Sequence, residues 1–170
     1  MAQIPQGAAP FAFSCFLPLV SLHGNFGVGW YYYTMKKITV ETIVKGSPEK
    51  VWKFWNEPEH ITKWAFASDD WEAPHAENDP VTGGKFLTRM SAKDGSSSFD
   101  FAGTYTNVVP LQKMEYAMSD GRTVTINFET LGDSVKVTEE FEMETENTEE
   151  LQRSGWQAIL ENFKKHVESN

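Results

Sequence analysis

The sequence predicts an α+β domain in which a strongly curved antiparallel sheet of seven strands surrounds one long C-terminal helix. Three patterns lead to this prediction: one alternating segment starts near residue 36, six more follow residue 69, and an apolar stripe with helical spacing ends the chain. Strands joined by tight turns must be antiparallel, because a parallel connection needs a crossover of a dozen or more residues. The twisted sheet is the only partner large enough to cover the stripe of the long helix.

The first predicted strand is Lys36–Lys45, in which every second side chain is apolar or threonine. A helix is expected directly after it, because Ser47 is a favourable N-cap and Pro48 suits the first helical position. Pro58 marks the start of a second short helix in the same way. The sequence therefore predicts a bent pair of short helices between the first strand and the rest of the sheet.

The other six strands are predicted to form a meander. The dipeptides Asp94-Gly95 and Asp120-Gly121 are hairpin signals between neighbouring strands. The strands are expected from Asp69 to the turn at Asp79, and at Lys85–Ser91, Ser98–Val109, Gln112–Met118, Arg122–Leu131 and Val135–Met143. The last element is a helix at Thr148–Val167, whose apolar stripe consists of Trp156, Leu160, Phe163 and Val167.

Charge and cysteine content exclude several classes of partner. The net charge of −9 disfavours nucleic acids and anionic membrane surfaces, since both attract proteins through Lys and Arg. The single cysteine, Cys15, can form neither an internal disulfide nor a cysteine-rich zinc site. A chain without disulfides is typical of a reducing compartment, and we expect a cytoplasmic protein with no nucleic-acid and no membrane partner.

Residues 1–34 differ from the rest of the chain because they contain no Lys, Arg, Asp or Glu. Their apolar run lacks the positive n-region of a signal peptide, and Pro10 and Pro18 interrupt it before it can span a bilayer. Two lysines and the first strand follow Met35 at once, which indicates a misassigned start. We therefore expect an uncharged extension that is disordered or non-native, followed by one domain at 35–170. A targeting segment or an ordered extension is the alternative.

A series of short motifs runs through residues 36–168. They are Ser47–Trp52, Pro58–Trp64, Gly83–Phe86, Met90 with Asp94-Gly95, Phe99–Tyr105, Leu111, Tyr116, Asp120–Arg122 and Gly155-Trp156. No single motif is specific alone, whereas their order and spacing together are. On these motifs the domain resembles the activator of heat-shock protein 90 ATPase homologue (AHSA1-like) family, within the START-like (SRPBCC) superfamily of helix-grip proteins.

The resemblance implies the helix-grip fold and a cavity beneath the last helix, but it implies no reaction. It leaves two kinds of function. The domain either binds a small apolar ligand in the cavity or acts in the stress response as a co-chaperone-like module that regulates an ATPase chaperone. The expected partner is accordingly a small apolar molecule or a chaperone-type protein. START-like relatives are often monomers or dimers, so we expect a monomer or a homodimer.

The patterns of the common enzyme and metal sites are missing from the sequence. Residues 35–170 contain no cysteine nucleophile, no Gly-x-Ser-x-Gly elbow, and neither a His-x-x-x-His nor a Cys-x-x-Cys pair. We therefore expect no cofactor and no metal, and we assign no catalytic residue. Binding is a better hypothesis than enzymatic activity.

Two polar residues on apolar strand faces need a separate explanation. Strict alternation places His75 on the face of Trp71 and Ala73, and Glu139 on the face of Phe141. The ordinary interpretations are a rim histidine with a satisfied hydrogen bond and a charged residue near a strand end. The functional interpretation makes both residues polar groups of the cavity. A third function follows from it, a cyclase-like enzyme that uses them as acid and base.

Aromatic residues make up 14% of the chain and either fill the core or line the cavity. We expect His60 to be exposed on its short helix, and His166 to be a favourable cation near the end of the last helix. The residues predicted to bind the ligand are Trp71, His75, Phe86, Met90, Phe101, Tyr105, Tyr116, Glu139, Trp156 and Leu160.

Overall fold

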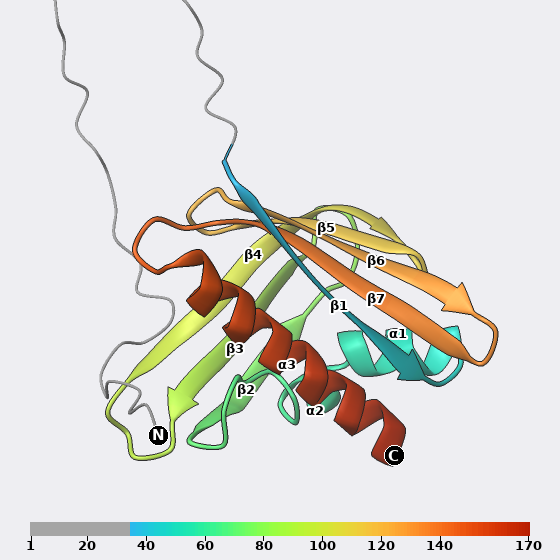
Figure 1. Cartoon of the computed structure of the whole chain (residues 1–170), viewed down its shortest axis with the longest axis horizontal. Helices are drawn as coiled ribbons and strands as arrows, with labels where there is room; N and C mark the ends of the chain where they lie inside the picture. Colours follow the sequence, from blue (N-terminus) through green and yellow to red (C-terminus); the bar gives the residue numbers. More distant parts are fainter. Residues whose placement is uncertain (1–34) are drawn as a thin grey trace, which may run out of the picture.

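The computed structural model describes residues 35–170, and the predictions for residues 1–34 lie outside this range. The elements follow in the predicted order: one strand, two short helices, six strands and one long helix (Figure 1). They are β1 (Lys37–Lys45), α1 (Pro48–Asn56), α2 (Pro58–Ile61), β2 (Trp71–Asn78), β3 (Lys85–Ala92), β4 (Ser98–Val109), β5 (Lys113–Met118), β6 (Thr123–Leu131), β7 (Ser134–Glu142) and α3 (Glu149–Ser169).

The seven strands form one antiparallel sheet in the order β1-β7-β6-β5-β4-β3-β2. Strands β2 to β7 are the predicted meander, because each pairs with its neighbour in sequence. Strand β1 joins the sheet beside β7, with Lys37 opposite Glu142 and Lys45 opposite Ser134. Figure 1 shows the sheet curling around α3. The predicted helix-grip fold is therefore confirmed.

Local sequence sets where the helices begin, as predicted. The Ser47 hydroxyl accepts a hydrogen bond from the Lys50 backbone N–H at 3.3 Å, and Pro48 lies in the first turn of α1. Pro58 occupies the same position in α2. The Thr148 hydroxyl caps α3 by accepting a hydrogen bond from a backbone N–H one turn later. None of the helices within residues 35–170 is long and apolar enough to cross a lipid bilayer.

Helix α3 holds the sheet in two ways. Its apolar stripe is buried against the concave face, and its buried residues are Gln152, Trp156, Leu160, Phe163 and Val167. Its polar flank reaches the free edge of β1. There Arg153 Nη1 donates to the Thr39 carbonyl oxygen at 2.7 Å, and Gln157 Nε2 donates to the Glu41 carbonyl oxygen at 3.1 Å. These bonds occupy backbone groups that an edge strand would otherwise expose.

Strand β2 departs from the predicted alternation. Its pairing with β3 shifts register between Glu72 and His75, and Pro74 lies inside this irregular segment. Proline cannot donate a backbone hydrogen bond, so it is found at bulges and sheet edges. The buried residues of β2 are Ala73, inside this irregular segment, and Ala76, after it, so they lie three positions apart instead of two. The prediction that His75 shares a face with Trp71 and Ala73 is therefore wrong.

Candidate functional site

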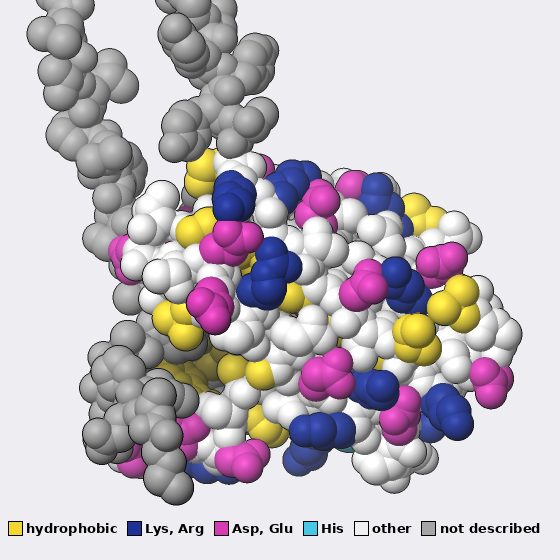
Figure 2. Space-filling view, in the orientation of Figure 1, with side chains coloured by type: hydrophobic (Ala, Val, Ile, Leu, Met, Phe, Trp, Pro, Cys, Tyr) yellow, Lys and Arg dark blue, Asp and Glu magenta, His cyan; other side chains and the backbone are white. Residues whose placement is uncertain are grey.

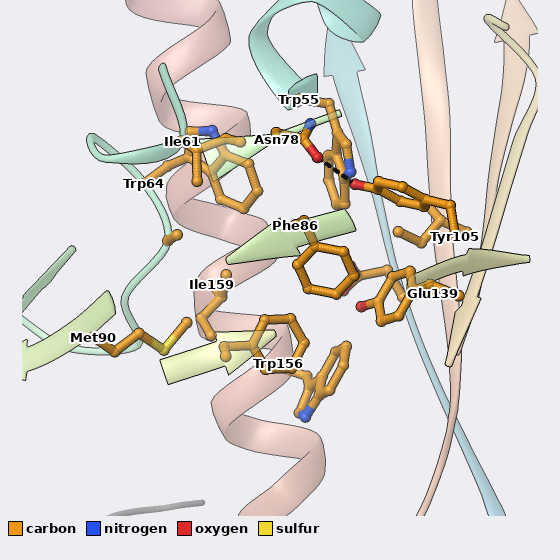
Figure 3. A pocket seen from close by; sticks show the side chains of 14 residues that line it. Trp55, Ile61, Trp64, Asn78, Phe86, Met90, Tyr105, Glu139, Trp156 and Ile159 are labelled. Atoms are coloured by element: carbon orange, nitrogen blue, oxygen red, sulfur yellow. Dashed lines mark hydrogen bonds between the residues drawn. The ribbon is translucent and has the colours of Figure 1, made fainter. Parts of the chain in front are cut away.

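A cavity of about 90 Å³ lies between α3 and the concave face of the sheet (Figure 3). Six of the strands, β2 to β7, each contribute lining residues, and the three helices close the other side. Figure 2 shows a hollow with apolar side chains at its base beside α3. The assembled sheet, and no single segment of the chain, therefore creates this site.

Seven of the ten residues predicted to bind the ligand line the cavity. They are Phe86, Met90, Phe101, Tyr105, Tyr116, Glu139 and Trp156. In Figure 3, Met90 and Glu139 lie at opposite ends of the cavity. The site is therefore elongated, with a thioether at one end and a carboxyl group near the other. Whether these residues bind a ligand stays a prediction.

Trp71 and Leu160 lie outside the cavity. Leu160 is completely buried in the packed stripe of α3. Trp71 pairs with Ala92 at the end of β2, and its ring lies 5.8 Å from the ring of Phe99. Phe99 is directly opposite Met90 in the register of β3 and β4, so these rings continue the concave face beyond Met90. Trp71 and Phe99 therefore form a half-buried apolar rim next to the cavity.

His75 lies on the outer side of the sheet. Its side chain is 56% exposed and its Nε2 is 3.0 Å from a carboxylate oxygen of Glu77. The register shift in β2 turns it away from the concave face, where Glu139 lies. The hypothesis of an enzyme that uses His75 and Glu139 as acid and base on one substrate is therefore wrong.

The other two described histidines form a pair, contrary to expectation. His60 is largely buried: its ring stacks on Phe54 at 3.7 Å between centroids, and its Nδ1 lies 3.1 Å from Nε2 of His166. Burial, together with the nearby charges of His60 and Lys63, lowers the pKa of His166. The neutral ring is thereby favoured. The predictions of an exposed His60 and of a cationic His166 at the helix end are both wrong.

Among residues 35–170, Glu139 is the one acidic or basic side chain that lines the cavity. It lies in the middle of β7, directly opposite Val40 on β1 and Ile126 on β6, and only 6% of its surface is exposed. Within the described chain no hydrogen bond or ion pair joins its carboxyl group to another residue. Burial raises the pKa of Glu139 to about 8, so the carboxyl group is mostly neutral and protonated at pH 7.

Two tyrosines supply further polar atoms. The Tyr105 hydroxyl donates to Oδ1 of Asn78 at 2.8 Å (Figure 3). Nδ2 of Asn78 in turn donates to the backbone carbonyl of Asn56 at the same distance. Burial raises the pKa of Tyr105 and of Tyr116, and the charge of Glu139 raises that of Tyr116 further. Both phenols are therefore neutral. Tyr105 is held in place by a chain of hydrogen bonds, whereas Tyr116 lies near Glu139.

Aromatic rings form most of the remaining wall. The Phe86 ring lies 4.8 Å from that of Tyr116, and the Phe101 ring lies 6.0 Å from that of Trp156, both edge to face. Phe86 lies over Gly103, its partner in β4: a Cβ atom added there would be 2.8 Å from the Phe86 ring. The absence of a side chain at this position therefore lets the ring pack flat against the sheet.

Seven lining residues were not predicted as site residues. They are Trp55, Ile61, Trp64, Ala65, Asn78, Ile126 and Ile159. Ile126 and Ile159 carry a usable signal, because they lie on the inner face of β6 and one turn after Trp156. Trp55 and Trp64 both line the cavity and pack against each other, with ring centroids 5.0 Å apart. Asn78 has no signal in the sequence beyond its position at a strand end.

The cavity does not resemble a metal site. Zinc needs three or four ligands from His, Cys, Asp or Glu, and the lining contains one carboxylate. Within residues 35–170, Glu57, Glu59 and His60 are the one group of three such side chains close together, and Glu59 is exposed. Glu57 is the N-cap of the four-residue helix α2, Glu59 and His60 belong to it, and none of the three lines the cavity.

Comparison with known proteins identifies the family. The sequence model described as "Activator of Hsp90 ATPase homolog 1-like protein" (AHSA1) matches residues 45–168. No curated protein matches the chain significantly. The chain therefore belongs to the AHSA1-like family, as its motifs predicted.

Solved structures of similar proteins share the fold. An AHSA1-like protein from Aeromonas hydrophila is 42% identical, with a TM-score of 0.74, and a protein from Cytophaga hutchinsonii is 53% identical, with a TM-score of 0.69. Each alignment covers 79% of this chain and 93% of the other. An Aha1 dimer from Colwellia psychrerythraea is 17% identical over 79% of this chain and 97% of its own, with a TM-score of 0.60. At that identity the likeness shows the fold alone.

Proposed function

We propose that the domain binds a small, mostly apolar molecule in the cavity between the sheet and α3. The observation that carries this proposal is the elongated aromatic cavity with one buried carboxyl group that has no partner among the described residues. Small-molecule sites are typically concave and apolar, with a few polar groups that orient the ligand. Glu139, Tyr116 and the hydrogen-bonded Tyr105 provide such groups here.

The size of the cavity limits what it encloses. Its volume of about 90 Å³ is smaller than the roughly 150 Å³ of an engineered cavity that binds benzene. The enclosed part therefore holds a short chain or head group. The remainder of a larger ligand would lie past Met90 on the rim of Trp71 and Phe99, where the concave face continues. A slender molecule with an aromatic or aliphatic end fits this shape.

Binding can be tested on the full chain with 4-phenylbutan-1-ol as a neutral probe. Ala65→Leu adds three carbon atoms to the cavity wall, whereas Ala117→Leu adds the same atoms on β5 at a position that does not line the cavity. We expect calorimetry and NMR chemical shifts to show binding by the wild type and by Ala117→Leu, and at least a tenfold loss in Ala65→Leu. Equal affinities in all three proteins would contradict binding in this cavity.

Native mass spectrometry of protein purified gently from cells provides a second test. A bound mass of small-molecule size, retained by Ala117→Leu and lost from Ala65→Leu, would identify the class of the natural ligand. A bare protein mass together with no binding of the probe would overturn the proposal.

A co-chaperone-like function is the alternative. The name of the family model, an activator of the Hsp90 ATPase, favours it, and so does the relative called Aha1, which is a dimer. This function needs a surface partner, so Ala65→Leu should leave it unchanged. A chaperone ATPase assay with Ala65→Leu and Ala117→Leu separates the two functions. Sedimentation of the same samples tests the expected monomer or homodimer.

A further inference from the structure

We propose that the ligand of this cavity carries a protonated amine whose ammonium group pairs with the carboxylate of Glu139. This inference rests on the proposed function, because it assigns the chemical class of the molecule bound there. It concerns the deep end of the cavity, where Glu139 lies at the opposite end from Met90 (Figure 3).

Among residues 35–170, no Lys, Arg or His lines the cavity around Glu139, and no hydrogen bond reaches its carboxyl group. Its neighbours across the sheet are Val40 and Ile126, and α3 faces the cavity with Trp156 and Ile159. The titratable groups that line the cavity from other strands are the phenols of Tyr105 and Tyr116, both neutral. A buried carboxylate is strongly unfavourable without a cation or hydrogen-bond donors. An ammonium group supplies both.

The lack of basic residues in the cavity lining and the negative charge of the chain disfavour other head groups. The cavity lining, all within the described residues, contains no Lys, Arg or His, so an anionic ligand would find no counter-charge. The whole chain has a net charge of −9, which attracts cations and repels anions. A neutral polar head could be bound equally well by an amide or hydroxyl side chain. A carboxyl group gives an advantage specifically to a cation.

The aromatic walls add to this preference. Phe86, Phe101, Tyr116 and Trp156 surround the same space, with ring centroids 4.8 to 6.3 Å apart in the contacts that join them. A cation within about 6 Å of such ring faces gains cation–π attraction, and a desolvated site strengthens it. The cavity therefore combines the two features that recognise ammonium groups: a carboxyl group and aromatic faces.

Binding of an amine should release a proton from Glu139, which makes the affinity depend on pH. Burial holds the pKa of Glu139 at about 8, so the carboxyl group is mostly protonated at pH 7 before a ligand binds. When an alkylammonium ion binds, this proton leaves to the solvent and the carboxylate forms the ion pair. The affinity for the amine should therefore rise about tenfold per pH unit below pH 8, and stay level until the amine itself deprotonates, near pH 10.

Three probes with one scaffold test the inference: 4-phenylbutylamine, 4-phenylbutan-1-ol and 4-phenylbutanoic acid. Isothermal titration calorimetry of the full chain at pH 6, 7 and 8 gives the affinities. Titration of the amine in buffers of different ionisation enthalpy gives the number of protons released. At pH 8 we expect the amine to bind at least tenfold more tightly than the alcohol, with nearly one proton released per amine at pH 7.

Glu139→Gln and Glu140→Gln are matched variants. Both replace a carboxyl group by an amide, but Glu140 is the next residue along β7 and pairs with Lys37 outside the cavity, at 2.7 Å. Glu139→Gln should bind the alcohol as the wild type does and lose the preference for the amine. Glu140→Gln should keep that preference. The pH dependence of the wild type needs no variant, so the inference can be tested even if Glu139→Gln folds poorly.

The possible outcomes separate this inference from the function on which it rests. If the wild type binds alcohol and amine equally at every pH, the cavity binds apolar molecules but the amine class is wrong. Tightest binding of the acid would also overturn the amine class. If none of the three probes binds, both proposals fail together.

Discussion

The two halves of α3 face the same sheet in different ways. In the C-terminal half, Leu160, Phe163 and Val167 are completely buried, and the Phe163 ring contacts Trp55 and Trp64 at 4.7 and 5.0 Å. In the N-terminal half, Trp156 stacks on Phe141 at 4.0 Å on one side and borders the cavity on the other. The same helix therefore closes one end of the core and leaves the other end hollow.

The difference follows from what lies opposite each half. Helix α1 and the turn after α2 place the rings of Trp55 and Trp64 against the C-terminal half, and these rings fill the space between helix and sheet. The N-terminal half faces the curved strands β3 to β7 (Figure 1), and the cavity lies between them and the helix. We infer that stability comes mainly from the packed end and binding from the hollow end.

The largest expected effect is on the packed end. Phe163→Ala should lower the free energy of unfolding by roughly 3–5 kcal/mol, because it leaves a void among rings that cannot collapse into it. Ile159→Ala, one turn earlier and already beside the cavity, should cost only about 1 kcal/mol, since Ile159 is half-buried. Urea denaturation of both variants measures this. Similar losses would show that the two halves contribute equally.

At the hollow end, Glu139 should make the free energy of unfolding depend on pH. Glu139 has an ordinary pKa of 4.5 when unfolded and about 8 when folded, so the folded state binds the extra proton between these values. Its contribution to stability is complete below pH 4.5 and is lost as the pH rises through about 8. At about 1.4 kcal/mol per pKa unit, the loss between pH 5 and pH 8 reaches up to about 4 kcal/mol.

Glu139→Gln removes this titration, whereas Glu140→Gln retains it. The difference in unfolding free energy between Glu139→Gln and wild type should therefore shift in favour of the variant from pH 5 to pH 8. Urea denaturation at both pH values measures it. A difference that is independent of pH would mean that Glu139 is solvated or paired in solution.

The position of Phe86 in the cavity wall depends on Gly103. A Cβ atom at this position would lie 2.6 Å from the Ala117 carbonyl oxygen and 2.8 Å from the Phe86 ring. Gly103→Ala should therefore displace Phe86 and cost about 1–3 kcal/mol, as overpacking does. Gly155→Ala is the matched control, because nothing lies within 4 Å of a Cβ atom there. Thermal unfolding of both should show a loss in Gly103→Ala alone.

The smallest effect concerns the histidine pair at the packed end. Burial and the adjacent His60 lower the pKa of His166, so the contribution of His166 to stability is present above pH 6.5 and is lost as the pH falls through its folded pKa. His60→Gln removes one neighbouring charge and uncovers the ring. NMR titration should then show the pKa of His166 moving up towards 6.5. An unchanged value would contradict the contact between the two rings.

The sequence was a good guide to elements that local signals define. Ser47, Pro48 and Pro58 mark helix starts that the structure contains, and the buried positions of β1 alternate as the pattern predicted. It failed where an irregularity interrupts a pattern. Pro74 lies in the bulge that turns His75 outwards, and strict alternation across that bulge placed the residue on the wrong face. Such errors arise because one extra residue reverses every later side chain.

Site membership was only partly predictable. Alternation correctly put Glu139 on the inner face of β7, and the motifs indicated Phe86 and Trp156 near a cavity. Leu160 belongs to the same stripe as Trp156 but lies one turn too far along α3, opposite the packed end. Asn78 takes part only because β2 ends beside Asn56 and the Tyr105 hydroxyl. Neither position could be known without the three-dimensional packing.

The sequence by itself therefore determined the order of elements, the antiparallel sheet around α3, and the inner or outer face of most strand residues. These properties depend on neighbours within a few positions along the chain. Tertiary structure alone decided where α3 leaves space, which histidines meet, and that Glu139 is buried without a partner among residues 35–170. Those properties depend on how strands far apart in sequence approach one helix. The raised pKa of Glu139 arises from that approach, because burial by distant residues removes the water that would stabilise its charge.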